Sequence, residues 1–152
     1  MRIRQARLED SAEIALLRRQ TIRHVNANDY PEEVIESWSV KVGAQDFRKS
    51  ADTCKRWVAL EKERIIGFCE HNDACELSRM YVHKDHLRKG VGSRLLKVAE
   101  ASLEKQGCAE INIESTVTAK NFYERNGYKV LQKTTYKEDT KQPIYKMSKK
   151  FS

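Results

Sequence analysis

A strand that runs into a glycine loop and then into a helix constrains this chain more than any other feature. Met80–Val82 reads as the end of a strand, Arg88–Ser93 is a loop with two glycines, and an amphipathic helix follows at 92–105. Glycines let the backbone approach a ligand closely, and the first turn of a helix offers unpaired N–H groups and a positive dipole end. The unit therefore predicts a site for phosphate-like anions, with Arg88 and Lys89 adding charge at its rim.

The loop matches neither of two common nucleotide-binding patterns. No G-x-x-x-x-G-K-[ST] sequence occurs, and a Rossmann fingerprint would need glycine where Leu95 stands. A tight strand-to-helix turn without a ligand would carry the same two glycines, so the loop alone leaves both interpretations open. We expect a β-branched residue to do most harm at Gly92, because it would fill the phosphate's space and demand an unfavourable backbone angle.

The rest of the chain alternates strand-like and helix-like segments. Strands are predicted near 3–5, at 56–60, 65–71, 76–82, 109–114, 128–135 and 144–147, with a turn at 137–140 before the last one. Helices are predicted at 10–28, 32–40, 92–105 and 118–126. A capping box between Asp10 and Glu13 should open the first helix, and Gly43 should end the second. This order indicates one domain of the mixed α/β class.

Composition fits one globular domain and excludes several other classes. The chain has 152 residues, of which 39% are apolar, enough for one core. The longest apolar run, 65–69, is far too short to cross a bilayer, and no apolar stretch of signal-peptide length follows the basic segment 1–7. We therefore expect a cytoplasmic protein. The formal charge of +7 favours anionic partners without choosing among nucleic acid, a membrane surface and a phosphorylated cofactor.

The four cysteines show no metal-binding spacing. Cys54, Cys69, Cys75 and Cys108 form no C-x-x-C pair and have no neighbouring histidine pair. We expect free thiols that behave as small buried apolar residues in a reducing compartment, and no metal site.

A second motif follows the strand at 109–114. The segment from Ala119 to Tyr128 fits A-x-x-x-Y-E-x-x-G-[FY], which places the hydroxyl of Tyr123 on a short helix after a strand. With the glycine loop within 77–96, it completes two motifs in the order found in the GCN5-related N-acetyltransferase (GNAT) superfamily. The chain resembles that superfamily over almost its whole length. The resemblance implies a single N-acetyltransferase domain, 1–152, with a central mixed, mostly antiparallel sheet flanked by helices.

The resemblance also implies a reaction and a set of residues. The reaction is acetyl transfer from acetyl-CoA to an amine by direct attack, without a metal. The backbone of Met80, Tyr81 and Val82 would pair with the pantetheine arm as an added strand, and the loop amides would hold the pyrophosphate. The positions concerned are Leu87, Arg88, Lys89, Gly90, Val91, Gly92 and Ser93, together with Thr116. Tyr123 would act as the general acid that protonates the departing thiolate, because a phenol stays protonated at neutral pH. A packed aromatic beside Phe122 is its non-catalytic interpretation.

The position of the base varies within the superfamily, and two side chains of the cofactor site depart from its usual pattern. Glu76, six residues before Val82, stands where some superfamily members carry a catalytic glutamate, and Glu114 is the alternative. Either could also be a solvated charge at a strand edge. Leu87 replaces the usual Gln or Arg, and Thr116 replaces a frequent Asn. These changes weaken side-chain contacts to CoA and leave the amides in place.

A non-catalytic nucleic-acid-binding module is the rival function. It is suggested by C-terminal lysines that alternate with aromatic residues: Lys133, Tyr136, Lys137, Lys141, Tyr145, Lys146, Lys149, Lys150 and Phe151. Glu138 and Asp139 interrupt this run, and lysines on terminal strands usually mark a solvated edge. We therefore expect a small-molecule or peptide amine as partner, with neither a membrane nor nucleic acid, and leave a homodimer open. Three acidic residues, Glu32, Glu33 and Glu36, could attract a cationic amine or simply face water.

Overall fold

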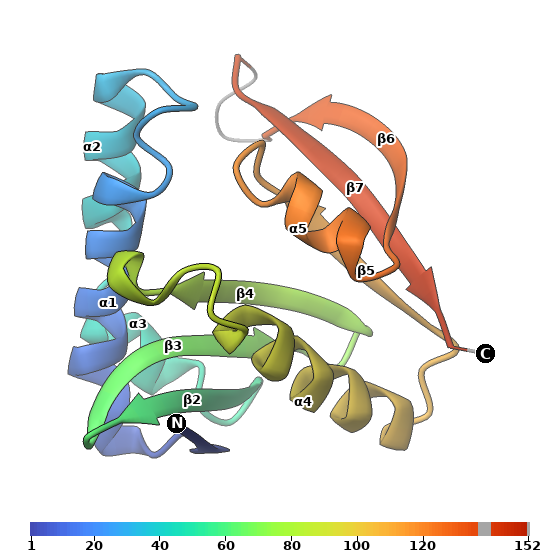
Figure 1. Ribbon diagram of the computed structural model, residues 1–152, viewed down its shortest axis with the longest axis horizontal. Coiled ribbons are helices and arrows are strands. Elements are labelled where there is room, and N and C mark those ends of the chain that lie inside the picture. The colour runs from blue at the N-terminus through green and yellow to red at the C-terminus, as the bar shows by residue number, and fades with distance from the viewer. Residues whose placement is uncertain (137–140, 152) are drawn as a thin grey trace.

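The computed structural model describes residues 1–136 and 141–151. Across them, a seven-stranded sheet runs in the order β1-β2-β3-β4-β5-β7-β6. Neighbouring strands are antiparallel except β4 and β5, which are parallel. Helices lie on both faces of the sheet (Figure 1). The predicted mixed, mostly antiparallel sheet flanked by helices is confirmed.

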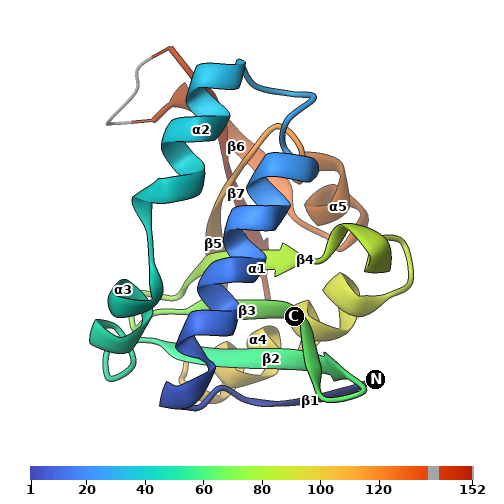
Figure 2. The ribbon, with the colours of Figure 1, turned by 90° about the vertical axis from the view of Figure 1, so that its left-hand side faces the viewer.

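The first part of the chain supplies one strand and the helices of one face. These elements are β1 (Arg2–Gln5), the 3-10 turn η1 (Leu8–Asp10), α1 (Ser11–His24), α2 (Glu32–Lys41) and α3 (Ala44–Lys49). Figure 2 shows α1 lying across the sheet with α3 beside its lower half and α2 above. The sequence did not predict α3. The expectation that Gly43 ends α2 is wrong, because α2 ends at Lys41 with Val42 as its C-cap. Gly43 instead begins α3, where the Asp46 carboxylate accepts a hydrogen bond from the Gly43 amide at 2.9 Å.

The predicted capping box at the start of α1 is wrong. The Asp10 carboxylate accepts hydrogen bonds from the Arg4 guanidinium at 2.8 Å and from the Arg7 amide at 2.7 Å. Glu13 accepts one from the Ile65 amide at 2.7 Å. Both carboxylates therefore fasten α1 to the sheet, because tertiary partners compete successfully with the local cap.

The middle of the chain forms the centre of the sheet. It comprises β2 (Lys55–Glu61), β3 (Arg64–His71), β4 (Glu76–Val82), the turn η2 (Lys84–His86) and α4 (Val91–Lys105). The hairpin of β2 and β3 is confirmed, and β4 begins and ends where the sequence predicts. Four residues of α4 are fully buried against the sheet: Leu95, Leu96, Ala99 and Leu103. This stripe fixes α4, and hence the glycine loop, on the face opposite α1.

The last part of the chain forms an arm beside this centre. It consists of β5 (Glu110–Ser115), α5 (Lys120–Arg125), β6 (Lys129–Thr135) and β7 (Pro143–Lys150). The helix α5 is shorter than predicted, and the expected turn at 137–140 lies outside the described residues. In the part of the chain that the structure describes, β6 pairs only with β7, and it is exposed along most of its length. The lysines on β6 therefore occupy a solvated sheet edge.

The first two residues of β4 pair with residues in the middle of β5. Glu76 pairs with Asn112 and Leu77 with Ile113. Beyond Leu77 the strands separate, and β5 pairs with β7 on its other side (Figure 1). We call the opening between β4 and β5 the fork.

A disulfide between Cys75 and Cys108 lies at the joined end of the fork, with the two Cα atoms 5.8 Å apart. The expectation of four free thiols is wrong for this pair, because the fold brings residues 33 positions apart to the adjacent starts of β4 and β5. Cys54 and Cys69 are free, and burial raises the pKa of Cys69 to about 12. Disulfides are uncommon in reducing compartments, so the cytoplasmic location stays a prediction.

No helix within 1–136 or 141–151 combines the length and apolar character needed to cross a bilayer.

Candidate active site

The glycine loop turns through two left-handed residues before α4 begins. Arg88 has a φ of 60° and Gly90, the N-cap of α4, a φ of 83°. None of the side chains within the described ranges caps this end of the helix. The first helical amides, Val91 to Ser93, precede the first intrahelical bond, which runs from the Arg94 amide to the Gly90 carbonyl at 3.1 Å. The turn therefore leaves a row of free N–H groups at the positive end of a 15-residue helix.

Gly92 is constrained by space rather than by its backbone angle. A Cβ at this position would lie 3.2 Å from the Phe122 ring and 3.6 Å from the Val82 side chain. Its φ is not positive, so the expected angular strain is absent there and occurs at Gly90 instead. The opening of α4 therefore packs directly against α5, the helix that carries Tyr123.

One edge of β4 is free to bind an extended ligand. The His83 amide donates to the Ile66 carbonyl of β3 at 2.8 Å. Since alternate residues of an antiparallel ladder point the same way, Tyr81 also faces β3, whereas the amides and carbonyls of Met80 and Val82 face the fork. Among the described residues, β5 pairs only with the first two residues of β4, so the rest of this edge is left unpaired by them and leads toward the glycine loop. The predicted placement of a pantetheine arm has the free backbone that it needs.

Tyr123 is buried on α5. It is 6% exposed and packs edge-on against Phe122 and Tyr128, with ring centroids 5.2 and 5.6 Å away. Within the described chain, no hydrogen bond involves its hydroxyl. Burial, and after it the neighbouring Cys69 and Tyr81, raises the pKa of this phenol well above its ordinary value. The hydroxyl is therefore a protonated donor without a partner.

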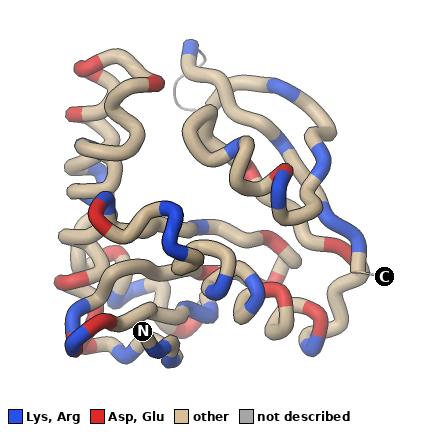
Figure 3. The backbone as a smooth tube through the Cα atoms, viewed as in Figure 1, with Lys and Arg blue, Asp and Glu red and all other residues tan. Residues whose placement is uncertain are grey.

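Leu87 and Thr116, which depart from the usual cofactor-binding pattern, lie in different environments. Leu87 is 40% exposed at the rim of the loop. The Thr116 hydroxyl accepts a hydrogen bond from the Ala119 amide at 3.2 Å and so helps to shape the turn into α5. Arg88 and Lys89 are exposed, and basic residues mark this loop in Figure 3.

The two candidate bases lie at different places. Glu76 is the first residue of β4, at the joined end of the fork, and accepts a hydrogen bond from the Asn72 amide group at 2.9 Å. Six residues of strand, about 20 Å at roughly 3.3 Å each, separate it from Val82. Glu114 lies two positions beyond Asn112, the register partner of Glu76, where the strands have separated, and it is exposed.

A group of aromatic residues that the sequence did not predict borders the fork on the α1 side. Trp38 of α2 stacks edge-on with Tyr30 and with Tyr136, at centroid distances of 4.7 and 5.0 Å. Tyr81 and Trp38 pack against the same buried cluster, which includes Tyr30. Burial, followed by the charges of Tyr30, Tyr81 and Glu114, raises the pKa of Tyr136. These residues come from four separate segments and follow no periodicity, so no local sequence pattern indicates that they meet.

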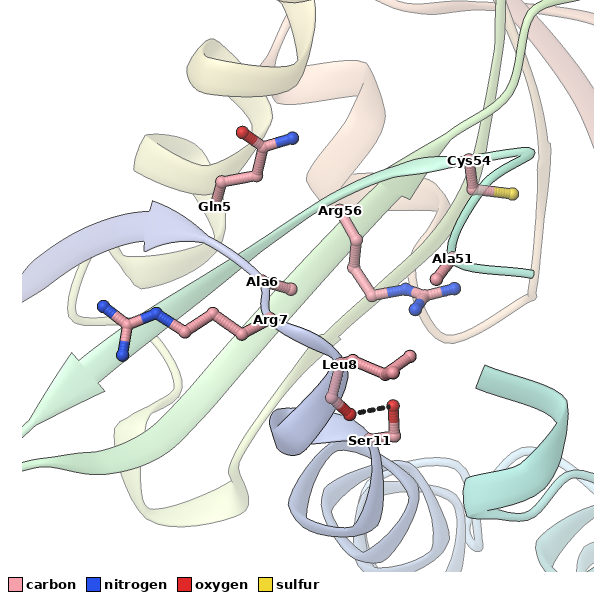
Figure 4. Close-up of a pocket in the computed structure, with 8 residues that line it drawn as sticks. All are labelled: Gln5, Ala6, Arg7, Leu8, Ser11, Ala51, Cys54 and Arg56. Carbon is pink, nitrogen blue, oxygen red and sulfur yellow. Dashed lines mark hydrogen bonds between the residues drawn. The ribbon is translucent and has the colours of Figure 1, made fainter. Parts of the chain in front are cut away.

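Two hollows lie elsewhere. One is a small cavity of about 60 Å³ between the end of β1 and the segment before β2, lined by the residues drawn in Figure 4, among them Ser11, Cys54 and Arg56. The other is a broad depression lined by Arg7, Leu8, Glu9 and Arg48. Neither includes a residue of the loop, the fork or α5, so neither belongs to the candidate site. No group of three or more His, Cys, Asp or Glu side chains in the described ranges is placed to hold a metal ion.

Known sequences point to one family. A family model described as "Acetyltransferase (GNAT) domain" matches residues 26–151. The spermidine N(1)-acetyltransferase of Thermoplasma acidophilum is 28% identical over 162 aligned positions, which cover 98% of this chain and 96% of that protein. An uncharacterized N-acetyltransferase of Escherichia coli, YafP, is 24% identical over 103 positions, covering 68% of this chain and 64% of its own.

Solved structures agree with the sequences. A GCN5-related N-acetyltransferase from Rhodopseudomonas palustris superposes with a TM-score of 0.92 at 22% identity, covering 99% of this chain and 95% of that one. The PaiA N-acetyltransferase of Thermoplasma acidophilum, solved in complex with coenzyme A, has a TM-score of 0.83 at 26% identity, with 99% and 98% covered. An aminoglycoside 6'-N-acetyltransferase, also complexed with coenzyme A, has a TM-score of 0.74 at 15% identity, with 99% and 97% covered.

Proposed function

Because this chain belongs to the GNAT family of acetyltransferases, we propose that it transfers an acetyl group from acetyl-CoA to an amine by direct attack at the mouth of the fork. The observation that carries the proposal is the continuity of free backbone groups. The unpaired edge of β4 at Met80 and Val82 leads to the free amides at the start of α4, and Tyr123 approaches from α5. Relatives solved with coenzyme A support the same cofactor.

The residues of the loop and of β4 fit this cofactor. The amides of Val91, Gly92 and Ser93 would hold the pyrophosphate, and the exposed Arg88 and Lys89 would add charge at the rim. The carbonyls and amides of Met80 and Val82 would hold the pantetheine arm as an added strand. When bound, acetyl-CoA supplies the acetyl group as an activated thioester.

Tyr123 is the proposed general acid. Its raised pKa keeps the phenol protonated at neutral pH, and its hydroxyl has no competing partner among the residues described. A proton donated from this hydroxyl would stabilise the thiolate that leaves when the amine attacks.

Glu114 is the preferred candidate for the base that accepts the amine's proton, because of its location in the fork. It lies on the separated part of β5, and its charge acts on Tyr136 of the aromatic group. Glu76 stays the alternative, acting from the joined end through a chain of water. Glu114→Gln and Glu76→Gln distinguish them, because the variant that removes the base should lose rate chiefly at low pH, where less of the amine is free.

The acceptor is an amine, and spermidine is the first compound to test because a relative is a spermidine N(1)-acetyltransferase. The experiment is a thiol-release assay with acetyl-CoA and a panel of polyamines, amino acids and aminoglycosides, with acetyl-CoA binding measured by calorimetry. We expect binding at micromolar level and thiol release with at least one amine. Absence of acetyl-CoA binding would reject the proposal.

A further inference from the structure

A buried arginine on α1 has no charged partner among the residues that the structure describes. Arg18 is 6% exposed, and its Nη1 donates to the Trp38 carbonyl at 3.0 Å. Its Nε has no hydrogen-bond partner in the described ranges, and neither has the buried hydroxyl of Thr21, three residues further along the helix. Buried polar groups are almost always paired, so two such atoms on one helix face require an explanation.

Glu70, a buried carboxylate of the sheet, already has its own partners. Glu70 accepts hydrogen bonds from Arg56 at 2.5 and 2.7 Å, and the Arg79 Nε lies 3.3 Å from its other oxygen. Burial lowers the pKa of Arg18, and Arg79 contributes further in the same direction, whereas Tyr81 opposes it. A buried guanidinium without a counter-charge is unfavourable, and an anion bound beside it would relieve the cost.

This cation lies beside the fork. Arg18 interacts electrostatically with the Tyr81 side chain. Tyr81 lies between Met80 and Val82 on β4, and its ring stacks on that of Phe68 with centroids 5.4 Å apart. Trp38, whose carbonyl Arg18 holds, packs with Tyr81 against the same buried cluster. An anion at Arg18 would therefore belong to a ligand in the acceptor half of the site.

We propose that Arg18, assisted by the Thr21 hydroxyl, binds a carboxylate of the acceptor, so that the preferred acceptor carries both an amine and a carboxylate. The inference rests on the proposed acetyl transfer and names its acceptor class. Charge-assisted pairing of a guanidinium with a carboxylate gives both affinity and orientation. Glu114, on the opposite side of the fork, would then receive the ammonium end. The alternative is that Arg18 only holds the end of α2 through Trp38.

Lysine and cadaverine test the proposal, because cadaverine is lysine without its carboxylate. We expect the wild type to use lysine with a kcat/KM at least about tenfold above that for cadaverine. Arg18→Gln should lower the value for lysine by about 10- to 100-fold, mainly through KM, and change that for cadaverine by less than about threefold. Thr21→Val, which is close in shape, should weaken lysine use in the same selective way.

Controls separate recognition from folding and from chemistry. Arg23→Gln, an exposed change on the same helix, should leave both acceptors unaffected. Arg18→Lys keeps the charge and should retain part of the preference if Arg18→Gln fails to fold. Thermal shift of Tyr123→Phe with either amine measures binding without turnover, so selective binding of lysine supports the inference even if no amine is acetylated. Equal losses for both amines in Arg18→Gln, or a wild type that prefers cadaverine, overturn it.

Discussion

The Tyr30 hydroxyl accepts a hydrogen bond of 2.8 Å from the amide of Val117, 87 residues further along the chain. The same hydroxyl donates to the Pro143 carbonyl at 3.4 Å. One side chain of the α1–α2 loop therefore holds both the turn after β5 and the start of β7. It joins the arm to the helical face across the open end of the fork.

Removing this hydroxyl should loosen the arm. In Tyr30→Phe the Val117 amide loses its partner, and we expect the free energy of unfolding to fall by about 1–3 kcal/mol. Acceptor KM should rise while acetyl-CoA binding is retained. Tyr145→Phe is the control, because no hydrogen bond of its hydroxyl is found in the described part of the chain. Denaturant unfolding measures the difference, and equal stability of the two variants would contradict the role of Tyr30.

Tyr123→Phe tests the general acid. We expect kcat to fall by about 100-fold or more while acetyl-CoA binding survives, because only a proton donor is removed. Tyr128→Phe is a matched control: it breaks a 2.8 Å hydrogen bond to Glu100 on α4 and should cost stability with little effect on kcat. Steady-state kinetics and a pre-steady-state burst measurement are needed together. An unchanged chemical step in Tyr123→Phe would remove this residue from the mechanism.

The two loop glycines should respond differently to substitution. Gly92→Val drives a side chain into the Phe122 ring at the opening of α4, so the thermal stabilisation that acetyl-CoA gives the wild type should disappear. Gly90→Ala meets nothing within 4 Å but keeps a φ of 83°, which costs about 1–2 kcal/mol of stability. A full cofactor-induced shift in a folded Gly92→Val protein would rule out this placement of the cofactor.

The Cys75–Cys108 disulfide should contribute measurably to stability. Closing a 33-residue separation is worth about 3–4 kcal/mol in the chain-entropy treatment. Cys108→Ser and the reduced wild type should therefore unfold at similarly lowered denaturant concentrations, whereas Cys54→Ser should not change the midpoint. Coinciding midpoints for the oxidised and reduced wild type would show that the linkage adds nothing.

His71 should make the protein sensitive to mild acid. Its ring contacts the Asn72 carbonyl at 3.0 Å and the Ser102 hydroxyl at 2.8 Å, and burial lowers its pKa below the ordinary 6.5. The unfolded chain then takes up a proton at higher pH than the folded protein does. The free energy of unfolding therefore falls as the pH drops below about 6.5, until the folded-state pKa is passed.

Melting temperatures at pH 7.5 and 5.5 measure this dependence. The decrease should be smaller in His71→Gln than in the wild type and unchanged in His24→Gln, an exposed position. Asp10 does not interfere, because its pKa is lowered by the Arg4 hydrogen bond and its contribution is lost only below about pH 3.8.

The sequence was most informative where local pattern decides the structure. The strand 76–82 and the hairpin before it have apolar and β-branched runs bounded by turn residues, and the structure reproduces them closely. Asp10 and Glu13 also fit a local pattern, yet Arg4 and Ile65 bind them instead. Sequence spacing could not show this, because both partners belong to other elements.

The same distinction between local and long-range contacts separates the predicted part of the candidate site from the part that was missed. The loop amides and Tyr123 lie within short motifs and were predicted as cofactor and catalytic residues. Trp38, Tyr136 and Arg18 come together only through the packing of α1, α2 and the arm. No local spacing marks an acceptor site assembled from distant segments.

Only two described residue pairs connect β4 to β5, so backbone pairing between the two parts of the seven-stranded sheet is very limited. Backbone hydrogen bonds alone would let the four-stranded centre and the three-stranded arm open as separate cooperative units. What makes them unfold together is one shared buried core, to which Ile111 and Tyr123 of the arm and Leu95 of α4 all belong. The disulfide at one end and the Tyr30 contacts at the other add to this coupling. A ligand that contacts both units therefore adds its binding free energy to their coupling. Bound ligand would make the unfolding of the whole molecule more cooperative.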